Sequence, residues 1–287
     1  MTDITISNNG VDLAASVYEP ADAKPILFLH GIGLSRDTWE ETAQKLAGRH
    51  RVWVLDFRGH GHSDRAPSYE LKDYVSDAEA VLSMIAQPTI VVGHSLGGCV
   101  AGLLAQTARA DIQGVFLEDP PWYLGEPGEW DKSAFPKIFP VVSAWQEKWQ
   151  QERAPFATYL EFVSNLPSPM GGIASDHFSP RHLWSNASSL QRQDIRCWGN
   201  VNGAVGGSAL SVIEAGQPFT CPSKIIHADP RFGAALLAGH GARLAETNPT
   251  AEIVYYQDCG HRPHAARAFE ARFLNDLEGF LSKAHRL

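Results

Sequence analysis

The sequence predicts an α/β protein built on a mostly parallel sheet with helices on both faces. Short apolar runs such as PILFLH (25–30) and RVWVLD (51–56) alternate with helix-like segments through the first half of the chain. Strands that are buried on both faces of a parallel sheet are typically near-continuous apolar runs of this kind. The 287 residues, 44% of them hydrophobic, are enough for one large domain or for one domain with an insertion.

Each predicted element follows from its local pattern. The strands are short β-branched and aliphatic runs, predicted at 25–30, 51–56, 88–93, 114–119, 223–229 and 251–256. The helices place apolar residues three and four apart on one face, as Val75, Ala78 and Leu82 do in the second of them. They are predicted over 38–48, 74–86 and 98–108, and from about residue 264 toward the C-terminus, so that His264 falls inside the last one.

The alternation breaks between residues 120 and 218. This stretch is dense in proline and holds six of the eight tryptophans. We expect a core formed by residues 1–119 and 219–287, with residues 120–218 inserted as a helical lid whose tryptophans mostly pack its own small core. The stretch 202–209 is rich in glycine, but no strand precedes it and it contains no G-x-G-x-x-G, which argues against a dinucleotide-binding loop. We therefore expect a loop or hinge of the lid there.

The composition limits the classes of molecule that we expect the protein to bind. The net charge is −8 and no basic block is present, which argues against nucleic acid. No secretory signal and no apolar stretch of membrane-spanning length is visible, and the four scattered cysteines match neither a disulfide framework nor a zinc site. We therefore expect a cytoplasmic protein that acts on a small molecule without membrane or nucleic acid, and leave a homodimer open.

The stretch VVGHSLGG (91–98) carries the strongest signal for chemistry. Gly93-His94-Ser95-Leu96-Gly97 has the form G-x-S-x-G and stands between a predicted strand and a predicted helix. Glycines on both sides let the backbone reverse sharply and expose the serine at the sheet edge. We predict that Ser95 is a nucleophile.

A serine nucleophile needs a base and donors for an oxyanion. His261, in QDCGHRPH, follows a glycine at a strand end and is the preferred base over His264. The backbone N–H groups of Leu96 and of Ile32, in the glycine-rich HGIGLS, are the predicted oxyanion donors. A metal held by the H-x-x-H pair is disfavoured, since a third ligand is not evident.

A second glycine-punctuated loop, DFRGHGHSD (56–64), lies at the same predicted sheet edge. Its histidines His60 and His62 could suggest a metal. We favour a loop rigidified by Asp56 and Arg58.

The pieces HGIG, DFRGHGHSD, GHSLGG and CGH, in this order, resemble the α/β-hydrolase superfamily. The resemblance covers residues 25–119 and 222–287. It implies an eight-stranded, mostly parallel sheet and a serine–acid–histidine triad, with no metal and no cofactor.

Two strand-end carboxylates compete for the place of the triad acid. Asp229 ends SKIIHAD, the usual position in the superfamily, but the loop after it runs straight into a predicted apolar helix. Asp119 ends GVFLED, where two prolines follow it. The second arrangement resembles a subgroup that includes N-formylmaleamate deformylase and 2-(acetamidomethylene)succinate hydrolase. We favour Asp119 and keep Asp229 as the alternative, whereas Glu118 should point to the other side of its strand.

These residues predict a serine hydrolase that cleaves an ester, lactone or amide through an acyl-enzyme. A cofactor-free dioxygenase on the same fold and a non-enzymatic small-molecule receptor are the alternatives. The subgroup resemblance implies small carboxylated substrates, for which a lid arginine is a suitable ligand. The candidates for substrate binding are Trp122, Arg181 and Trp184. Arg181 and Trp184 lie three residues apart, so we expect them to share a helical face directed toward the pocket. The further lid arginines are Arg153, Arg192 and Arg196.

Overall fold

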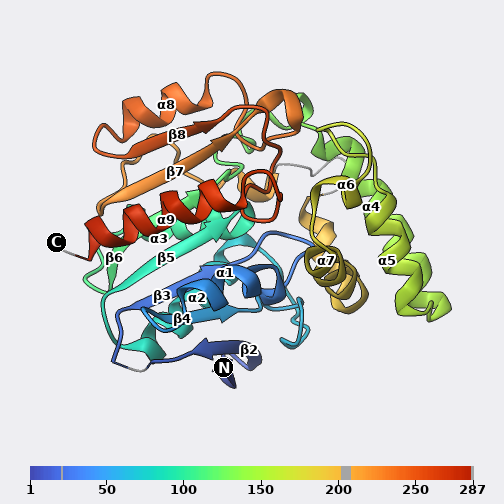
Figure 1. Ribbon diagram of the computed structural model, residues 1–287, viewed down its shortest axis with the longest axis horizontal. Helices are drawn as coiled ribbons and strands as arrows, with labels where there is room; N and C mark the ends of the chain where they lie inside the picture. Colours follow the sequence, from blue (N-terminus) through green and yellow to red (C-terminus); the bar gives the residue numbers. More distant parts are fainter. Residues whose placement is uncertain (21, 202–207, 286–287) are drawn as a thin grey trace.

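The computed structural model, which describes residues 1–20, 22–201 and 208–285, contains an eight-stranded sheet with the order β1-β2-β4-β3-β5-β6-β7-β8 (Figure 1). β1 and β2 form an antiparallel pair, β2 runs antiparallel to β4, and the remaining pairs are parallel. The predicted mostly parallel sheet is confirmed. The strands are β1 (Thr2–Asn8), β2 (Val11–Tyr18), β3 (Pro25–Leu29), β4 (Arg51–Leu55), β5 (Thr89–His94), β6 (Ile112–Glu118), β7 (Ser223–Ala228) and β8 (Glu252–Tyr256).

Helices cover both faces of this sheet. On one face α1 (Glu40–Leu46) and α9 (Glu270–Ala284) pack on Ile26 and Phe28 of β3 and on their neighbours. On the other face α2 (Leu71–Ile85), α3 (Leu96–Gln106) and α8 (His240–Thr247) contribute to a second core cluster, which includes the alternate β3 residues Leu27 and Leu29. This alternation of side chains explains why the central strand β3 is apolar at every position. None of the described helices is both long and apolar enough to cross a membrane.

The described part of the segment between β6 and β7 contains four α-helices, which Figure 1 shows together on one side of the molecule. They are α4 (Phe135–Glu152), α5 (Phe156–Asn165), α6 (Ala174–His177) and α7 (Pro180–Arg192). Trp149 and Trp198 are buried in a small core of their own there, with Tyr159 and Val163. Residues 202–207, most of the predicted glycine-rich loop, lie outside the described residues.

Short 3₁₀ turns complete the fold: η1 (Arg36–Trp39), η2 (Trp130–Lys132), η3 (Ile195–Asn200), η5 (Ser208–Leu210) and η6 (Pro230–Phe232). Two of the predicted boundaries were wrong. The C-terminal helix begins at Glu270, and His264 lies in the turns before it, where Glu118 accepts hydrogen bonds from its backbone N–H and its ring. Asp229 is followed by a 3₁₀ turn that ends at Gly233 (φ +80°), so the chain does not run directly into a helix.

Candidate active site

Ser95 occupies a sharp turn between β5 and α3. Its backbone has φ +52°, a strained value for a residue with a side chain. The turn is possible because its neighbours are glycines. A Cβ atom added at Gly93 would lie 2.1 Å from the carbonyl oxygen of Gly97, and one added at Gly97 would lie 2.3 Å from that of Leu29. The local sequence therefore presents the Ser95 hydroxyl at the end of the strand, where it lines a pocket.

The structure brings Asp119 and His261 together. Asp119 Oδ2 lies 2.7 Å from His261 Nδ1. The same buried carboxylate accepts hydrogen bonds from the backbone N–H groups of Ala235, at 2.7 Å, and Leu236, at 3.1 Å. Because a carboxylate only accepts hydrogen bonds, Nδ1 carries the proton and Nε2 is left as the basic nitrogen. Three donors thus fix the acid, and the acid fixes the orientation of the imidazole.

The alternative acid has other partners. Asp229 accepts hydrogen bonds from the side chain and backbone of Arg231 and from the backbone N–H of Asp258. The hydrogen bond from the Arg231 guanidinium is the largest influence, and it holds the pKa of Asp229 below its usual value. No hydrogen bond or ion pair joins Asp229 to His261 in the described chain. Of the two strand-end carboxylates, Asp119 is therefore the one placed to act with the histidine.

Ser95 and His261 line the same pocket, but no hydrogen bond joins Ser95 Oγ to the ring among the described residues. A nucleophile–base contact is often long in the absence of substrate and shortens when a substrate binds. Phe135 of the lid packs edge-on against His261, with ring centroids 5.4 Å apart. The lid thereby contacts the candidate base directly.

The two predicted oxyanion donors both face pockets beside Ser95. In the described part of the chain, the backbone N–H groups of Ile32 and Leu96 donate to no protein acceptor. Their loops are nevertheless held in place, since Gly97 N–H donates to the carbonyl of His30 at 3.1 Å and Leu34 N–H donates to that of Gly31 at 3.2 Å. Leu96 also begins α3, so the positive end of a helix dipole faces this point.

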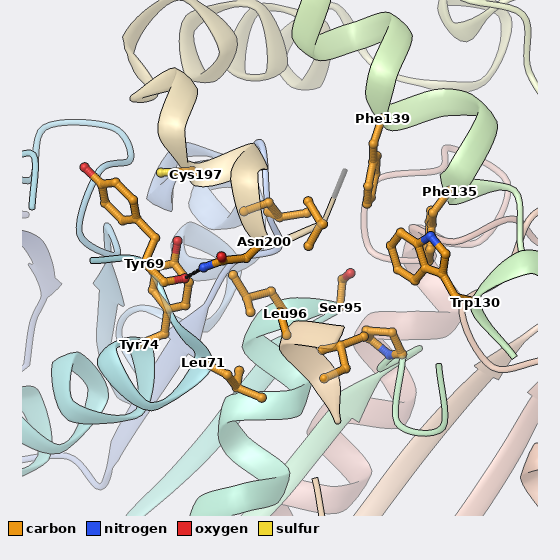
Figure 2. Close-up of a pocket in the computed structure, with 15 residues that line it drawn as sticks. Tyr69, Leu71, Tyr74, Ser95, Leu96, Trp130, Phe135, Phe139, Cys197 and Asn200 are labelled. Atoms are coloured by element: carbon orange, nitrogen blue, oxygen red, sulfur yellow. Dashed lines mark hydrogen bonds between the residues drawn. The ribbon is translucent and has the colours of Figure 1, made fainter. Parts of the chain in front are cut away.

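Two cavities meet at Ser95. The larger, of about 460 Å³, extends under the lid and contains His261. The smaller, of about 40 Å³, is shown in Figure 2, where Ser95 and Leu96 lie between lid aromatics and a group of residues from α2 and its approach. Its labelled lining residues are Tyr69, Leu71, Tyr74, Ser95, Leu96, Trp130, Phe135, Phe139, Cys197 and Asn200. A small molecule bound at Ser95 would therefore be enclosed mainly by apolar and aromatic side chains.

Sequence reasoning missed the supporting roles of two histidines, His94 and His264. His94 Nε2 lies 3.1 Å from the carbonyl oxygen of His261, so the residue before the candidate nucleophile holds the loop of the candidate base. Burial lowers the pKa of His94 well below its usual value, which keeps the ring neutral and Nε2 able to donate. His264 pairs with Glu118 at 2.6 Å on the other side of β6, as expected for the carboxylate next to Asp119. The sequence offered little sign of these contacts beyond the positions of the two rings, since His94 directly precedes Ser95 and His264 follows His261 by three residues.

The three predicted substrate-binding residues lie outside both cavities. Trp122 is 1% exposed and packs over α3, where a Cβ atom added at Gly102 would lie 2.4 Å from its ring. Arg181 and Trp184 do share a helical face, with the guanidinium 5.5 Å from the indole centroid, but this face is exposed and Arg181 pairs with Glu40. The expectation that these residues face the pocket disagrees with where the structure places them.

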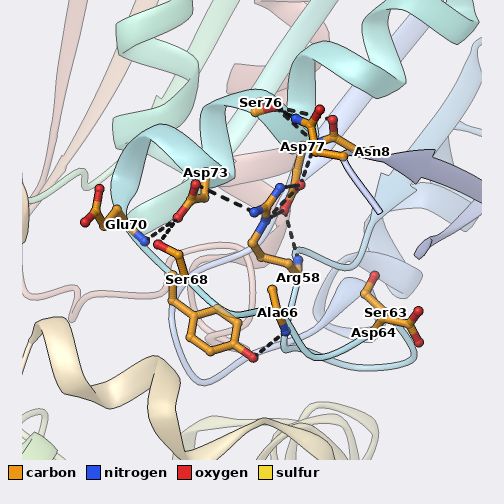
Figure 3. A network of polar contacts seen from close by, with 12 residues as sticks. Asn8, Arg58, Ser63, Asp64, Ala66, Ser68, Glu70, Asp73, Ser76 and Asp77 are labelled. Atoms are coloured by element: carbon orange, nitrogen blue, oxygen red, sulfur yellow. Dashed lines mark hydrogen bonds and ion pairs between the residues drawn. The ribbon is translucent and has the colours of Figure 1, made fainter. Parts of the chain in front are cut away.

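The loop 56–64 is held by a polar network. Arg58 forms a buried ion pair with Asp77 at 2.6 Å and donates several hydrogen bonds to it (Figure 3). Asp56 accepts hydrogen bonds from the backbone N–H groups of Arg36 and His62. Within the described ranges, no three histidine, cysteine or acidic side chains gather as a metal site. The contacts of Asp56 and Arg58 are those expected of a rigid loop.

A family model for the alpha/beta hydrolase fold matches residues 24–166. The chain belongs to the α/β-hydrolase superfamily. As a member of it, the chain resembles N-formylmaleamic acid deformylase from Pseudomonas putida in structure, with a TM-score of 0.71 over 96% of this chain and 100% of that one. Their sequences are 17% identical, so this match shows a shared fold.

Two curated relatives of this α/β-hydrolase are matched over shorter segments. A serine hydrolase-like protein of Danio rerio is 30% identical over 112 residues, which are 38% of this chain and 34% of the relative. The (E)-2-((N-methylformamido)methylene)succinate hydrolase of Acinetobacter baylyi is 28% identical over 111 residues, 38% of this chain and 41% of the relative. The matched segments thus span about a third to two fifths of these relatives, and both relatives are named as hydrolases.

Proposed function

We propose that the protein is a serine hydrolase that cleaves an ester, lactone or amide bond of a small molecule through an acyl-enzyme. The observation that carries the proposal is the 2.7 Å contact between buried Asp119 and His261, in the pocket that also contains Ser95. The names of the relatives support it, since they describe the hydrolysis of a succinate derivative and the deformylation of N-formylmaleamic acid.

In the proposed mechanism, Ser95 Oγ attacks the carbonyl carbon of the substrate while His261 Nε2 removes the hydroxyl proton. Asp119 stabilises the imidazolium that forms and keeps Nδ1 protonated. The N–H groups of Ile32 and Leu96 bind the oxyanion, and each such donor contributes roughly 3 kcal/mol in comparable sites. His261 then protonates the leaving alcohol or amine, and water repeats the attack on the acyl-enzyme.

A fluorophosphonate probe tests this proposal, because it reacts with activated serines. The wild type should be labelled and Ser95→Ala should not. Ser168→Ala is the matched control, since Ser168 is the other serine that lines the larger cavity. Labelling that persists in Ser95→Ala, or that disappears in Ser168→Ala alone, would contradict the assignment of Ser95.

A panel of small esters, lactones and amides should then show turnover well beyond one product per protein. An oxygen electrode run in parallel distinguishes hydrolysis from the dioxygenase alternative. A protein that consumes oxygen, or that releases at most one equivalent of product, would not be a hydrolase of this kind.

A further inference from the structure

The larger cavity has an unusual distribution of charge for a chain of net charge −8. Its titratable lining residues are His94, Lys137, His261 and Arg262, and its described lining includes no aspartate or glutamate. Most of the remaining wall is apolar, including Phe139, Val142, Leu166, Met170 and Phe178. The cavity therefore offers positive charge inside an apolar enclosure, next to the candidate base.

Arg262 is the cation closest in sequence to that base, directly after His261, and it is partly buried. Its guanidinium lies over the ring of Phe178, with Cζ 4.4 Å from the ring centroid. Among the described residues this guanidinium makes no ion pair and no side-chain hydrogen bond, whereas the partly buried Arg36 and the buried Arg58 each pair with aspartates. A cation–π contact uses no hydrogen-bond donor, so the N–H groups of Arg262 remain for a ligand.

The nearby acids are already engaged. Glu118 attracts Arg262 electrostatically, but both of its oxygens accept hydrogen bonds from His264. Asp119 accepts hydrogen bonds from His261 and from two backbone N–H groups. Burial lowers the pKa of Arg262 to about 10, so that the group remains charged at neutral pH. A sheltered cation without a protein partner is costly, and an anionic ligand would offset that cost.

We propose that Arg262 binds a carboxylate of the substrate, so that the enzyme prefers small esters or amides that carry a carboxylate on an otherwise apolar body. The inference rests on the proposed function and adds a substrate class and a specificity residue to it. A carboxylate fits better than a phosphate dianion, because a single sheltered guanidinium binds one carboxylate through two N–H groups and balances one charge. Lys137, the other cation of the wall, is exposed.

Matched substrate pairs test the proposal. In the first pair, 3-acetoxybenzoate and 3-acetoxybenzamide, the carboxylate or its neutral isostere lies in the leaving group. In the second, the phenyl monoesters of glutaric and glutaramic acid, it lies in the acyl group. The readout is the ratio of kcat/KM for the carboxylate to that for the carboxamide, so a general loss of activity cancels out.

For the wild type we expect a preference on the order of 10- to 100-fold for the carboxylate in at least one pair, chiefly through KM, as for a charge-assisted bidentate contact. Arg262→Gln should reduce this ratio to near one. The control Arg272→Gln, which changes an exposed arginine on α9, should keep it. A wild type without preference in either pair, or a preference that survives in Arg262→Gln, would overturn the inference.

A second variant guards against misfolding. Arg262→Lys keeps the charge and should retain part of the preference. Failure of the proposed function can be distinguished from failure of this inference. If the wild type hydrolyses none of the four esters and does not react with a fluorophosphonate, the hydrolase proposal itself is wrong. Binding of 3-hydroxybenzoate and of neutral 3-hydroxybenzamide to the wild type and to Arg262→Gln, measured by calorimetry, would then still show whether Arg262 holds a carboxylate, and equal binding of the two compounds to the wild type would refute that as well.

Discussion

Replacing Asp119 by asparagine removes one charge at the centre of the proposed triad and changes little else in shape. In the wild type, Asp119 Oδ2 accepts hydrogen bonds from His261 Nδ1 and from the backbone N–H of Ala235, while Oδ1 accepts one from the backbone N–H of Leu236. An asparagine offers only one accepting oxygen, so its NH₂ group must face either a backbone N–H or the protonated Nδ1. The imidazole then loses its charged partner and is free to adopt the wrong tautomer.

The size of the effect follows from these contacts. Losing the charge opposite a forming imidazolium costs about 10⁴ in kcat in the serine-protease triad, so we expect a loss of at least about 10³ here. One buried N–H left without an acceptor should lower the free energy of unfolding by about 1–3 kcal/mol. The catalytic loss should therefore be much larger than any loss of folded protein.

Asp229→Asn is the matched control, because Asp229 is also fully buried, ends the next strand and accepts from both backbone and side-chain donors. It should retain activity within about tenfold of the wild type. The assay is the steady-state hydrolysis of an activated ester, with thermal unfolding of each variant measured beside it. The reasoning is refuted if folded Asp119→Asn keeps activity within that range, or if Asp229→Asn is the inactive enzyme.

Three further predictions concern the support around the site. Gly31→Ala should reduce kcat/KM at least about tenfold, because the added Cβ would lie 2.8 Å from His94 Nδ1 and displace the ring that holds the His261 loop; unchanged kinetics would show that this contact is irrelevant. Asp77→Asn should lower the free energy of unfolding, measured by chemical denaturation, by about 3–5 kcal/mol, because it leaves the buried Arg58 without its main partner. A loss below about 1 kcal/mol would contradict that account. For His60, burial lowers the pKa to about 4, so only the unfolded ring takes a proton below pH ~6.5 and stability is lost as the pH falls. Denaturation of the wild type and of His60→Gln should therefore show the wild type losing up to about 2 kcal/mol more between about pH 7.5 and pH 5, and a gap that stays constant would disprove this.

The sheet and the serine turn were predictable because their determinants are local. A strand that is buried on both faces is apolar at most positions, and the turn at Ser95 needs glycines at fixed offsets from it. The position of Asp119 at a strand end followed in the same way. Its partners could not be derived locally, since Ala235, Leu236 and His261 are more than a hundred residues away along the chain.

The lid shows where the sequence was harder to interpret. The three-residue spacing of Arg181 and Trp184 did predict a shared face, but not the direction of that face. A signal was present, because Leu183, Ala187 and Leu190 recur at helical spacing and form the buried side of α7, which leaves Arg181 and Trp184 outside it.

Arg262 was overlooked for a different reason. It stands in the turns before α9, whose geometry depends on the distant pairing of Glu118 with His264. No helical or strand periodicity applies there, so the direction of its side chain could not be inferred from spacing. An arginine directly after the candidate base was the available sign.

The covalent intermediate gives the most direct test of the central claim. The wild type is mixed with excess activated ester, quenched in acid within milliseconds to seconds, and analysed by intact and peptide mass spectrometry. The account predicts a mass increase of one acyl group, located on the peptide that contains Ser95, and its absence in Ser95→Ala. Turnover without any acyl adduct, or an adduct on another residue that Ser95→Ala retains, would contradict the account.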